Sequence, residues 1–381
     1  MKQYKLLEIS TQYDLYLRKF YSTHNIDNLS YNELFSMLVE DSFAESDFIH
    51  RYLSKLGIES KVVFCNNRNL QDKWTPNNKD LSYFDILLMQ IKEFSPDVIL
   101  ISNMHYFTKE ETTIIKDCLS KGGKLVAYHF TPICDKFKQN VSLYDQIYTG
   151  SIHFVNMMRD YGVPAYLLRH AFEPSILDKV LAVEKENKVC FPGSIFLGEN
   201  MHNNRLDMLN SLIESNIPFD FYGDIHGNIQ SDDSIMEMEK PESVKEKQQR
   251  YINIIKKIEK NKKLGLFGIG YYNILNRYNI CINMHAPVVV KATGNIRMYE
   301  ATGMGTCLLT DYRSENSDLF DINSEIVVYE SLQDMAEKAK WLLDNPAKAK
   351  EIALAGQKKT LTKYTYKNKA EQLNEYIQEL L

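Results

Sequence analysis

Short apolar runs alternate with longer helical patterns along most of the chain, and this alternation restricts the fold more than any other feature. The runs "PDVILIS", "KLVAY" and "YNICINMH" are typical of strands, whereas "YFDILLMQIKEF" is typical of a helix. A strand that is apolar along its whole length is buried on both faces of its sheet. We therefore predict an α/β protein whose parallel sheets are covered by helices on both faces.

The length of the chain and a second start of the pattern indicate two domains. The chain has 381 residues, more than a single hydrophobic core usually holds. The alternation stops at a polar, helix-like connector near residues 172–187 and then begins again. We expect Rossmann-like domains over residues 1–171 and 185–361. We also expect one long helical stretch over residues 31–56 and a charged helical insertion over residues 232–263.

Charge, cysteine spacing and hydropathy exclude several classes of protein. The formal net charge of -5 argues against a nucleic-acid partner. The six cysteines stand far apart, without the spacing of a zinc knuckle or a redox motif, which suits a reducing compartment. The start "MKQYKLLEIS" has no long apolar stretch, and no run approaches the ~20 residues of a membrane-spanning helix. We expect a cytoplasmic protein with at most peripheral membrane contact.

The stretch "GNIRMYEATGMGTCLLTDY" follows a predicted strand and contains the first candidate site. A helix that begins near Asn295 would direct its N-terminal amides at a phosphate. Arg297 could bind a phosphate or carboxylate through two hydrogen bonds. Glu300 lies three residues further on the same helical face and suits a pair of sugar hydroxyls. The alternative is an ion pair between Arg297 and Glu300 on a solvated face.

The same stretch, with "ICINMH" before it, resembles the donor-binding segment of the CgeB-like glycosyltransferases. "DSFAESDF", "LGIESKVVFCNNRNLQDKW", "YDQIYTGSIHFV" and "RHAFEPSIL" also resemble blocks of this family, in the family's order. The resemblance implies a GT-B fold, in which the first domain binds the acceptor and the second binds the donor. It also implies that a last helix within 362–381 crosses back to the first domain.

The resemblance assigns roles to several residues. It implies that Glu300 holds the ribose of the nucleotide and favours His285 as a ligand of the donor phosphate. It also points to Arg205, which matches an arginine of the family. Many retaining GT-B enzymes carry a second acidic residue where this chain has Ala292. The stereochemical outcome of those enzymes therefore cannot be transferred to this chain.

Three further turns after strands are candidates for the donor site. "FPGSI" brings Gly193, which permits a close approach of the backbone, and Ser194, which could donate to phosphate. Tyr222 closes a strand and could contact the nucleobase. Thr11 and Tyr13 follow the first strand, in a loop that meets the diphosphate or the acceptor in GT-B folds. Each turn could instead be a plain connection.

Glycosyl transfer also needs a group that accepts the proton of the attacking hydroxyl. His105 and His129 follow predicted strands of the first domain and could act as this base, although a lone histidine is more often structural. Asp47 is the acidic alternative for this base, but it could instead be a surface residue or the capping residue of a helix. Trp74 either stacks on an acceptor sugar or packs at the edge of a domain.

No spacing in the sequence resembles a metal site, so we expect no metal and no other cofactor. The predicted function is transfer of a sugar from a nucleotide-sugar donor to a glycan, lipid-linked or protein acceptor, in surface glycan or glycoconjugate biosynthesis. A nucleotide-sugar 2-epimerase and a non-catalytic subunit that binds a nucleotide sugar remain alternatives.

Overall fold

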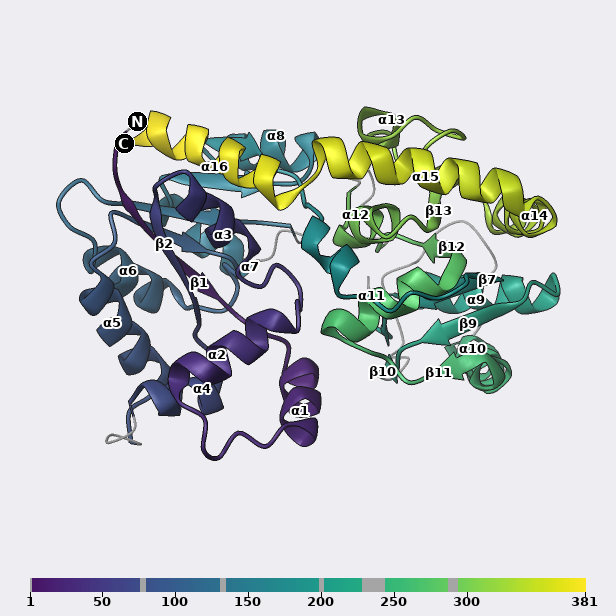
Figure 1. The fold of residues 1–381 in the computed structure, drawn as a ribbon, viewed down its shortest axis with the longest axis horizontal. Coiled ribbons are helices and arrows are strands. Elements are labelled where there is room, and N and C mark those ends of the chain that lie inside the picture. Colours follow the sequence, from purple (N-terminus) through teal and green to yellow (C-terminus); the bar gives the residue numbers. More distant parts are fainter. Residues whose placement is uncertain (1, 76–79, 131–134, 199–201, 228–243, 287–293) are drawn as a thin grey trace. The chain divides into compact units, whose positions relative to one another are not determined.

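The computed structural model describes residues 2–75, 80–130, 135–198, 202–227, 244–286 and 294–381 (Figure 1). The chain forms two compact units. Unit 1 comprises Met1–His170 and Thr365–Leu381, and unit 2 comprises Ala171–Tyr364. Unit 2 thus includes the segment that the sequence marked as a connector. The binding roles predicted for the two domains stay predictions.

Unit 1 contains a six-stranded parallel sheet in the order β2-β1-β3-β4-β5-β6. Its strands are β1 (Lys5–Ser10), β2 (Glu59–Phe64), β3 (Val98–Ile101), β4 (Lys124–Tyr128), β5 (Gln146–Thr149) and β6 (Ala165–Leu167). Strand β3 is buried along its length, as its continuous apolar sequence predicts.

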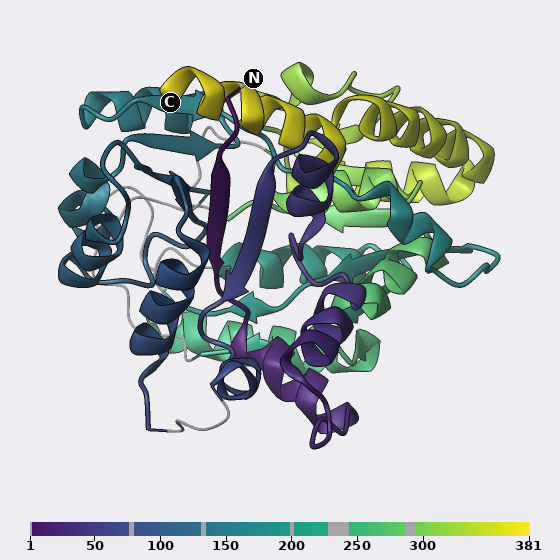
Figure 2. The same cartoon turned by 60° about the vertical axis from the view of Figure 1, so that its left-hand side comes forward.

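Helices flank the sheet of unit 1 (Figure 2). They are α1 (Asp14–Thr23), α2 (Tyr31–Glu40), α3 (Phe48–Lys55), α4 (Arg68–Trp74), α5 (Tyr83–Phe94), α6 (Lys109–Asp117), α7 (Asp135–Asn140), η1 (Val141–Leu143), α8 (Ile152–Asp160) and α16 (Tyr366–Leu380). Capping boxes begin α2, α5, α6 and α16, so local sequence sets where these helices start. Leu7 and Ile9 of β1 belong to one apolar core with Leu87 and Ile91 of α5.

Unit 2 repeats this arrangement with a second six-stranded parallel sheet, ordered β11-β9-β7-β12-β13-β14, and a small pair, β10-β8. The strands are β7 (Glu186–Pro192), β8 (Ile195–Phe196), β9 (Phe219–Tyr222), β10 (Ile225–His226), β11 (Lys262–Lys263), β12 (Tyr278–Asn283), β13 (Cys307–Asp311) and β14 (Val327–Tyr329). The helices are η2 (Pro174–Asp178), α9 (Asn203–Glu214), α10 (Val244–Ile258), η3 (Glu259–Asn261), α11 (Gly268–Arg277), α12 (Ile296–Gly303), α13 (Asn316–Leu319), α14 (Leu332–Asp344) and α15 (Pro346–Lys363).

Two of the helix predictions made from the sequence are wrong. The stretch 31–56 is broken into α2 and α3, because Ser42, Ala44 and Ser46 all adopt positive φ angles in the turn between them. The connector forms only the short η2 and then runs without helix to β7. The sequence pattern also missed α11. The first part of the expected charged insertion, residues 232–243, lies outside the described residues. Its next part forms the helix α10, Val244–Ile258.

The C-terminal helix α16 belongs to unit 1 and packs against α3 (Figure 1). The Lys369 ammonium bonds to Glu45 at 2.7 Å and lies over the ring of Tyr128. At the other end of the helix, Gln378 Oε1 accepts a hydrogen bond from the amide of Lys2. The last part of the chain therefore completes the first unit. Among the described helices, none has the length and apolar character to cross a membrane.

Candidate donor-binding site

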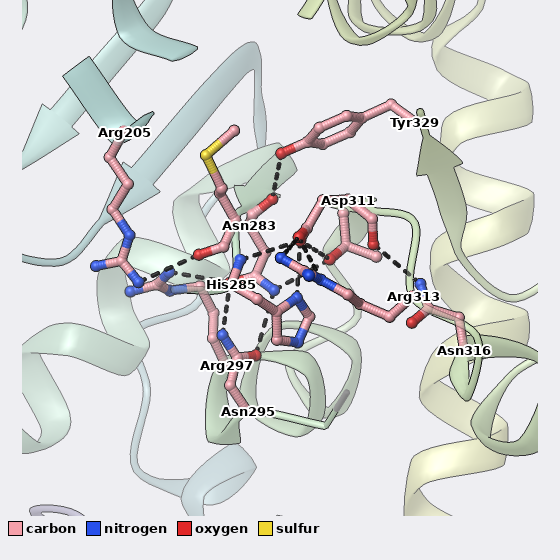
Figure 3. Close-up of polar contacts among 11 residues, drawn as sticks. Arg205, Asn283, His285, Asn295, Arg297, Asp311, Arg313, Asn316 and Tyr329 are labelled. Carbon is pink, nitrogen blue, oxygen red and sulfur yellow. Dashed lines mark hydrogen bonds and ion pairs between the residues drawn. The ribbon is translucent and has the colours of Figure 1, made fainter. Parts of the chain in front are cut away.

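The carboxyl ends of β7, β12 and β13 lie side by side in unit 2, because these strands are neighbours in one parallel sheet. Loops beyond such strand ends form the ligand sites of open α/β sheets. Helix α12 begins here after its N-cap residue Asn295, and α9 contributes Arg205 (Figure 3). The structure thus brings residues from five elements together at this edge.

Two arginines, the buried Arg205 and the partly buried Arg297, form the centre of the site. Their guanidinium groups lie over the ring of Phe191, Arg205 at 5.8 Å and Arg297 at 5.1 Å from its centroid. In the described part of the chain, their hydrogen-bond partners are neutral: the carbonyls of Ser194 and Met284, the His202 ring and the Asn283 amide. Burial and the charge of Arg297 lower the pKa of Arg205. Two adjacent cations that form no ion pair with the described residues would be stabilised by an anionic ligand.

Asn283 at the end of β12 fixes the position of Arg297. Its Oδ1 accepts from Arg297 Nη1 at 3.0 Å and from the side-chain amide of Asn295 at 3.0 Å. Its Nδ2 donates to Thr310 Oγ1 at 3.0 Å, and its backbone carbonyl accepts from the Tyr329 hydroxyl at 2.8 Å. This side chain is completely buried, so the network holds the start of α12 against the sheet.

His285 faces the same site and is oriented by Asp311 (Figure 3). Its Nδ1 lies 2.7 Å from Asp311 Oδ1, and Arg313 holds the other carboxylate oxygen. Burial opposes ionisation of Asp311, but His285 and Arg313 outweigh it and lower the pKa of this carboxyl. Nδ1 therefore donates to Asp311. Nε2 is buried and has no partner among the residues described, so it can bind a ligand.

Gly193 is required by the position of Arg297. A Cβ atom at Gly193 would lie 2.3 Å from Arg297 Nη2, and the residue has a φ of +152°. Gly223 packs closely behind this turn, because its own Cβ would lie 2.7 Å from the Gly193 carbonyl oxygen. The turn "FPGSI" thus brings backbone and guanidinium into direct contact.

Glu300 lies one turn along α12 and is held by two tyrosines of α11. Tyr271 donates to Oε2 at 2.8 Å, and Tyr272 donates to Oε1 at 3.4 Å. Burial raises the pKa of Glu300, and the Tyr271 hydroxyl opposes this shift. The expected alternative of an Arg297–Glu300 pair on a solvated face is wrong, because Glu300 is buried and faces the two tyrosines.

Tyr222 and Ser194 stand beside this cluster. The Tyr222 hydroxyl bonds to that of Tyr278 at 2.8 Å, while its carbonyl accepts from the Gly193 amide. Ser194 Oγ accepts a long hydrogen bond of 3.4 Å from the Asp224 amide. Their roles toward a nucleobase and a phosphate stay predictions, as do all site assignments made from the sequence.

Unit 1 brings together two of the predicted residues. The rings of His105 and His129, which follow β3 and β4, lie 5.4 Å apart. His129 is only 2% exposed and packs against Phe137 and Phe154. Thr11, which follows β1, accepts a hydrogen bond from Asn103 Nδ2 at 3.2 Å. Tyr13, just before α1, is 69% exposed.

Asp47 stands apart from these histidines in its contacts. It precedes α3, forms an ion pair with Arg51 at 2.6 Å, and lines a cavity beside β2. Ala292, the position at which the chain departs from many retaining enzymes, lies outside the described residues. No group of three potential metal ligands occurs in the residues that the structure describes, and the expectation of a metal-free enzyme stays a prediction.

Sequence reasoning missed Asn283, Asp311 and the tyrosine pair. Asn283 and Asp311 stand in the motifs "ICINMH" and "CLLTD" at strand ends, so their positions in the motifs could have identified them. Tyr271 and Tyr272 belong to α11, a helix that the sequence pattern did not predict. Their contact with Glu300 follows from tertiary packing, which a local pattern does not contain.

Comparisons with known proteins agree with this architecture. A family model described as "Glycosyl transferase-like", which is the CgeB-like family, matches residues 208–375. That range includes β12, α12 and β13, the elements that build the site. No curated protein sequence gives a significant match to the chain.

Solved structures share the fold over the full chain at low sequence identity. HepE from Anabaena, crystallised with UDP and glucose, matches with a TM-score of 0.57 and 11% identity, over 99% of this chain and 100% of its own. Sucrose-phosphate synthase from Thermosynechococcus elongatus matches with a TM-score of 0.59 and 9% identity, over 100% of this chain and 99% of its own. AviGT4, a glycosyltransferase of avilamycin A biosynthesis, matches with a TM-score of 0.58 and 12% identity, over 99% of this chain and 98% of its own. Residues 208–375 thus match the CgeB-like glycosyltransferase family, and the whole chain has the GT-B fold of glycosyltransferases.

Proposed function

We propose that this enzyme transfers a sugar from a UDP-sugar to a hydroxyl group of a glycan, lipid-linked or protein acceptor, without a metal ion. The product would be a surface glycan or another glycoconjugate. The observation that carries the proposal is the pair of adjacent guanidinium groups of Arg205, which is buried, and Arg297, which is partly buried, whose hydrogen-bond partners in the described chain are neutral. A diphosphate would supply the missing negative charge and accept hydrogen bonds from both groups.

The choice of uridine follows from proteins with the same fold. HepE has been crystallised with UDP and with UDP-glucose, and an α-glucosyltransferase of similar fold with UDP and DNA. Glu300, held in the same unit by Tyr271 and Tyr272, would accept hydrogen bonds from the ribose hydroxyls. Each carboxylate oxygen can accept more than one hydrogen bond, so the tyrosines leave room for the ribose.

Catalysis would depend on charge that develops on the leaving diphosphate. Arg205, Arg297 and His285 Nε2, which has no partner among the described residues, would stabilise that charge, together with the amides at the start of α12. Such preorganised groups replace a metal ion. In unit 1, His105 or His129 would accept the proton of the attacking hydroxyl.

Calorimetric titration with UDP tests the donor site. Arg297→Met keeps the side-chain length but removes the charge, and we expect UDP affinity to fall by roughly ten- to a hundredfold, as for a lost charge-assisted hydrogen bond. Arg277→Met is the matched control, because Arg277 lies in the same unit on an exposed ion pair with Glu186. Unchanged UDP binding by a folded Arg297→Met protein would refute the diphosphate site.

Release of UDP from UDP-sugars, with and without acceptors, tests the reaction itself. A transferase releases UDP in proportion to the acceptor that it glycosylates, whereas an epimerase needs no acceptor and a non-catalytic subunit releases none. Turnover should survive EDTA. If EDTA abolished turnover and Mg²⁺ or Mn²⁺ restored it, the metal-free mechanism would be wrong.

A further inference from the structure

A cavity of about 370 Å³ lies in unit 1, around the edge strand β2. Helices α2, α3, α4 and α5 all contribute to its walls. Its lining residues on β1 and β2 come from the middle of these strands, at Leu7 and residues 60–63, and not from their carboxyl ends. The cavity is therefore separate from the strand ends that carry Thr11, His105 and His129. It has the volume of a small-molecule site.

Aromatic side chains form a large part of the wall. Trp74 of α4, Tyr31 and Phe35 of α2, and Phe94 of α5 all line the cavity. Aromatic faces combine a large apolar contact area with a fixed shape, and ligand pockets are commonly built from them.

Apart from Asp47, whose Oδ1 is ion-paired with Arg51, three polar side chains of the lining carry a buried atom without a hydrogen bond to the described residues. They are Oε1 of Gln90, Nδ1 of His50 and Oγ of Ser60, each without a partner among the described residues. Gln90 and His50 are each only 6% exposed. Buried polar atoms are normally satisfied, so three exceptions around one cavity indicate that a ligand or water completes them.

The charges of the lining are balanced, which indicates an uncharged ligand. Arg51 pairs with Asp47 at 2.6 Å, and the Lys61 ammonium lies 5.0 Å from the centroid of the Phe94 ring. Glu93 supplies the second carboxylate of the lining. Two cations and two carboxylates leave no excess charge to attract a phosphate or a polyanion.

We infer that this cavity is a second saccharide-binding site, which holds one neutral pyranose unit of a glycan. The aromatic walls would cover the apolar faces of the sugar ring, while its hydroxyls would bond to Gln90, His50 and Ser60. Only the choice of a sugar over another hydroxylated ligand rests on the reaction proposed above. The site would retain a growing glycan on unit 1 between transfer steps.

The two tryptophans of the chain make the site measurable without any donor. Trp341 lies in α14 of unit 2, so Trp341→Phe leaves Trp74 as the single fluorescent reporter at the cavity. We would titrate this variant with methyl glycosides of glucose, galactose, mannose and N-acetylglucosamine up to their solubility limits. A saturable change of Trp74 fluorescence with at least one of them is expected.

Gln90→Met and Gln71→Met, both in the Trp341→Phe background, separate binding from stability. Gln90→Met keeps the side-chain volume and removes the unpaired oxygen, so thermal stability should hold while the saccharide affinity falls roughly five- to tenfold. Gln71 is also buried but does not line the cavity, and its amide donates to the Phe64 carbonyl. Gln71→Met should lower stability and leave the affinity unchanged.

Two results would overturn the inference. One is the absence of a saturable response to any of the four glycosides. In that case, a response to the apolar dye ANS alone would assign the cavity to an apolar ligand. The other is an equal loss of saccharide affinity in both glutamine variants. UDP calorimetry on the same proteins keeps the outcomes distinct, because a failed donor site would remove the UDP signal and leave the Trp74 response intact.

Discussion

Arg297 occupies the space that a side chain at position 193 would need, so Gly193 belongs to the proposed donor site although it has no side chain. Gly193→Ala places a methyl group 2.3 Å from the guanidinium in the native geometry, at a φ of +152°. We expect the variant to lose about 1–3 kcal/mol of stability through strain. It should also lose UDP affinity, since Arg297 must move. Chemical denaturation and calorimetry measure the two effects.

Gly122→Ala is the control for backbone strain alone. Gly122 has a φ of +94°, but no atom lies within 4 Å of where its Cβ would be. This variant should lose stability and keep its UDP affinity. A Gly193→Ala protein that bound UDP as well as Gly122→Ala does would show that the position of Arg297 is irrelevant to the donor.

The two histidines of unit 1 allow a second prediction at a single residue. Only one of His105 and His129 is expected to act as the base, so one of the two alanine variants should lose turnover by roughly 10²–10⁴-fold with UDP affinity unchanged. His129 is packed among aromatic rings, and its replacement should also cost stability. Single-turnover kinetics, beside thermal unfolding, distinguish the two losses. A large loss in Asp47→Asn, with both histidine variants active, would transfer the role to the carboxylate.

Individual residues of the site were predictable where a motif marks a strand end. Arg297 and Glu300 stand at one face of a helix whose start follows β12, and the sequence showed both features. The sequence could not show that Tyr271 and Tyr272 hold Glu300, because those contacts join positions almost thirty residues apart. It also could not show that Asp311 fixes His285, which depends on the pairing of β12 with β13.

Helix α16 is joined to the rest of unit 1 by one buried charge. Lys369 is 2% exposed at its side chain and pairs with Glu45 at 2.7 Å. Burial opposes the ionisation of Glu45, but Lys369 and His170 outweigh it and lower the pKa of Glu45 to about 2. Because the folded pKa lies below the unfolded one, the pair stabilises the protein above pH ~4.5 and loses this effect as the pH falls toward ~2.

Glu45→Gln should therefore lower the free energy of unfolding by roughly 3 kcal/mol at neutral pH. The difference from the unmodified protein should shrink between pH 4.5 and 2. Glu371→Gln is the matched control, because Glu371 forms an exposed pair with Lys367 in the same helix and should cost less than ~1 kcal/mol. Urea denaturation across this pH range measures both. A pH-independent deficit in Glu45→Gln would exclude the ionic contribution.

Strands and capped helices were the predictable elements, since continuous apolar runs and capping residues act within a few positions. The turn between α2 and α3 was not predictable in the same way. Serine and alanine rarely adopt positive φ, yet Ser42, Ala44 and Ser46 all do so, and Phe43 between them stacks on Tyr16 at 3.9 Å. Tertiary packing holds this backbone against its local preference.

For the whole molecule, the two units give two reporters of unfolding. Trp74 belongs to unit 1 and Trp341 to unit 2, which carries the proposed donor site. Single-tryptophan variants should show that UDP raises the stability of unit 2 by about 2.7 kcal/mol at a hundredfold excess over its Kd. The Trp74 transition should shift less. Equal shifts of both transitions would mean that the units unfold as one cooperative body.

The return of the chain to unit 1 has a consequence for its synthesis on the ribosome. Translation produces most of unit 1 first, then all of unit 2, and only afterwards Lys369 and the rest of α16. Until that point Glu45 of the nascent chain lacks the Lys369 ammonium, and the surface of α3 that α16 covers stays exposed to solvent. The half of the protein that is made first is therefore the half that is completed last.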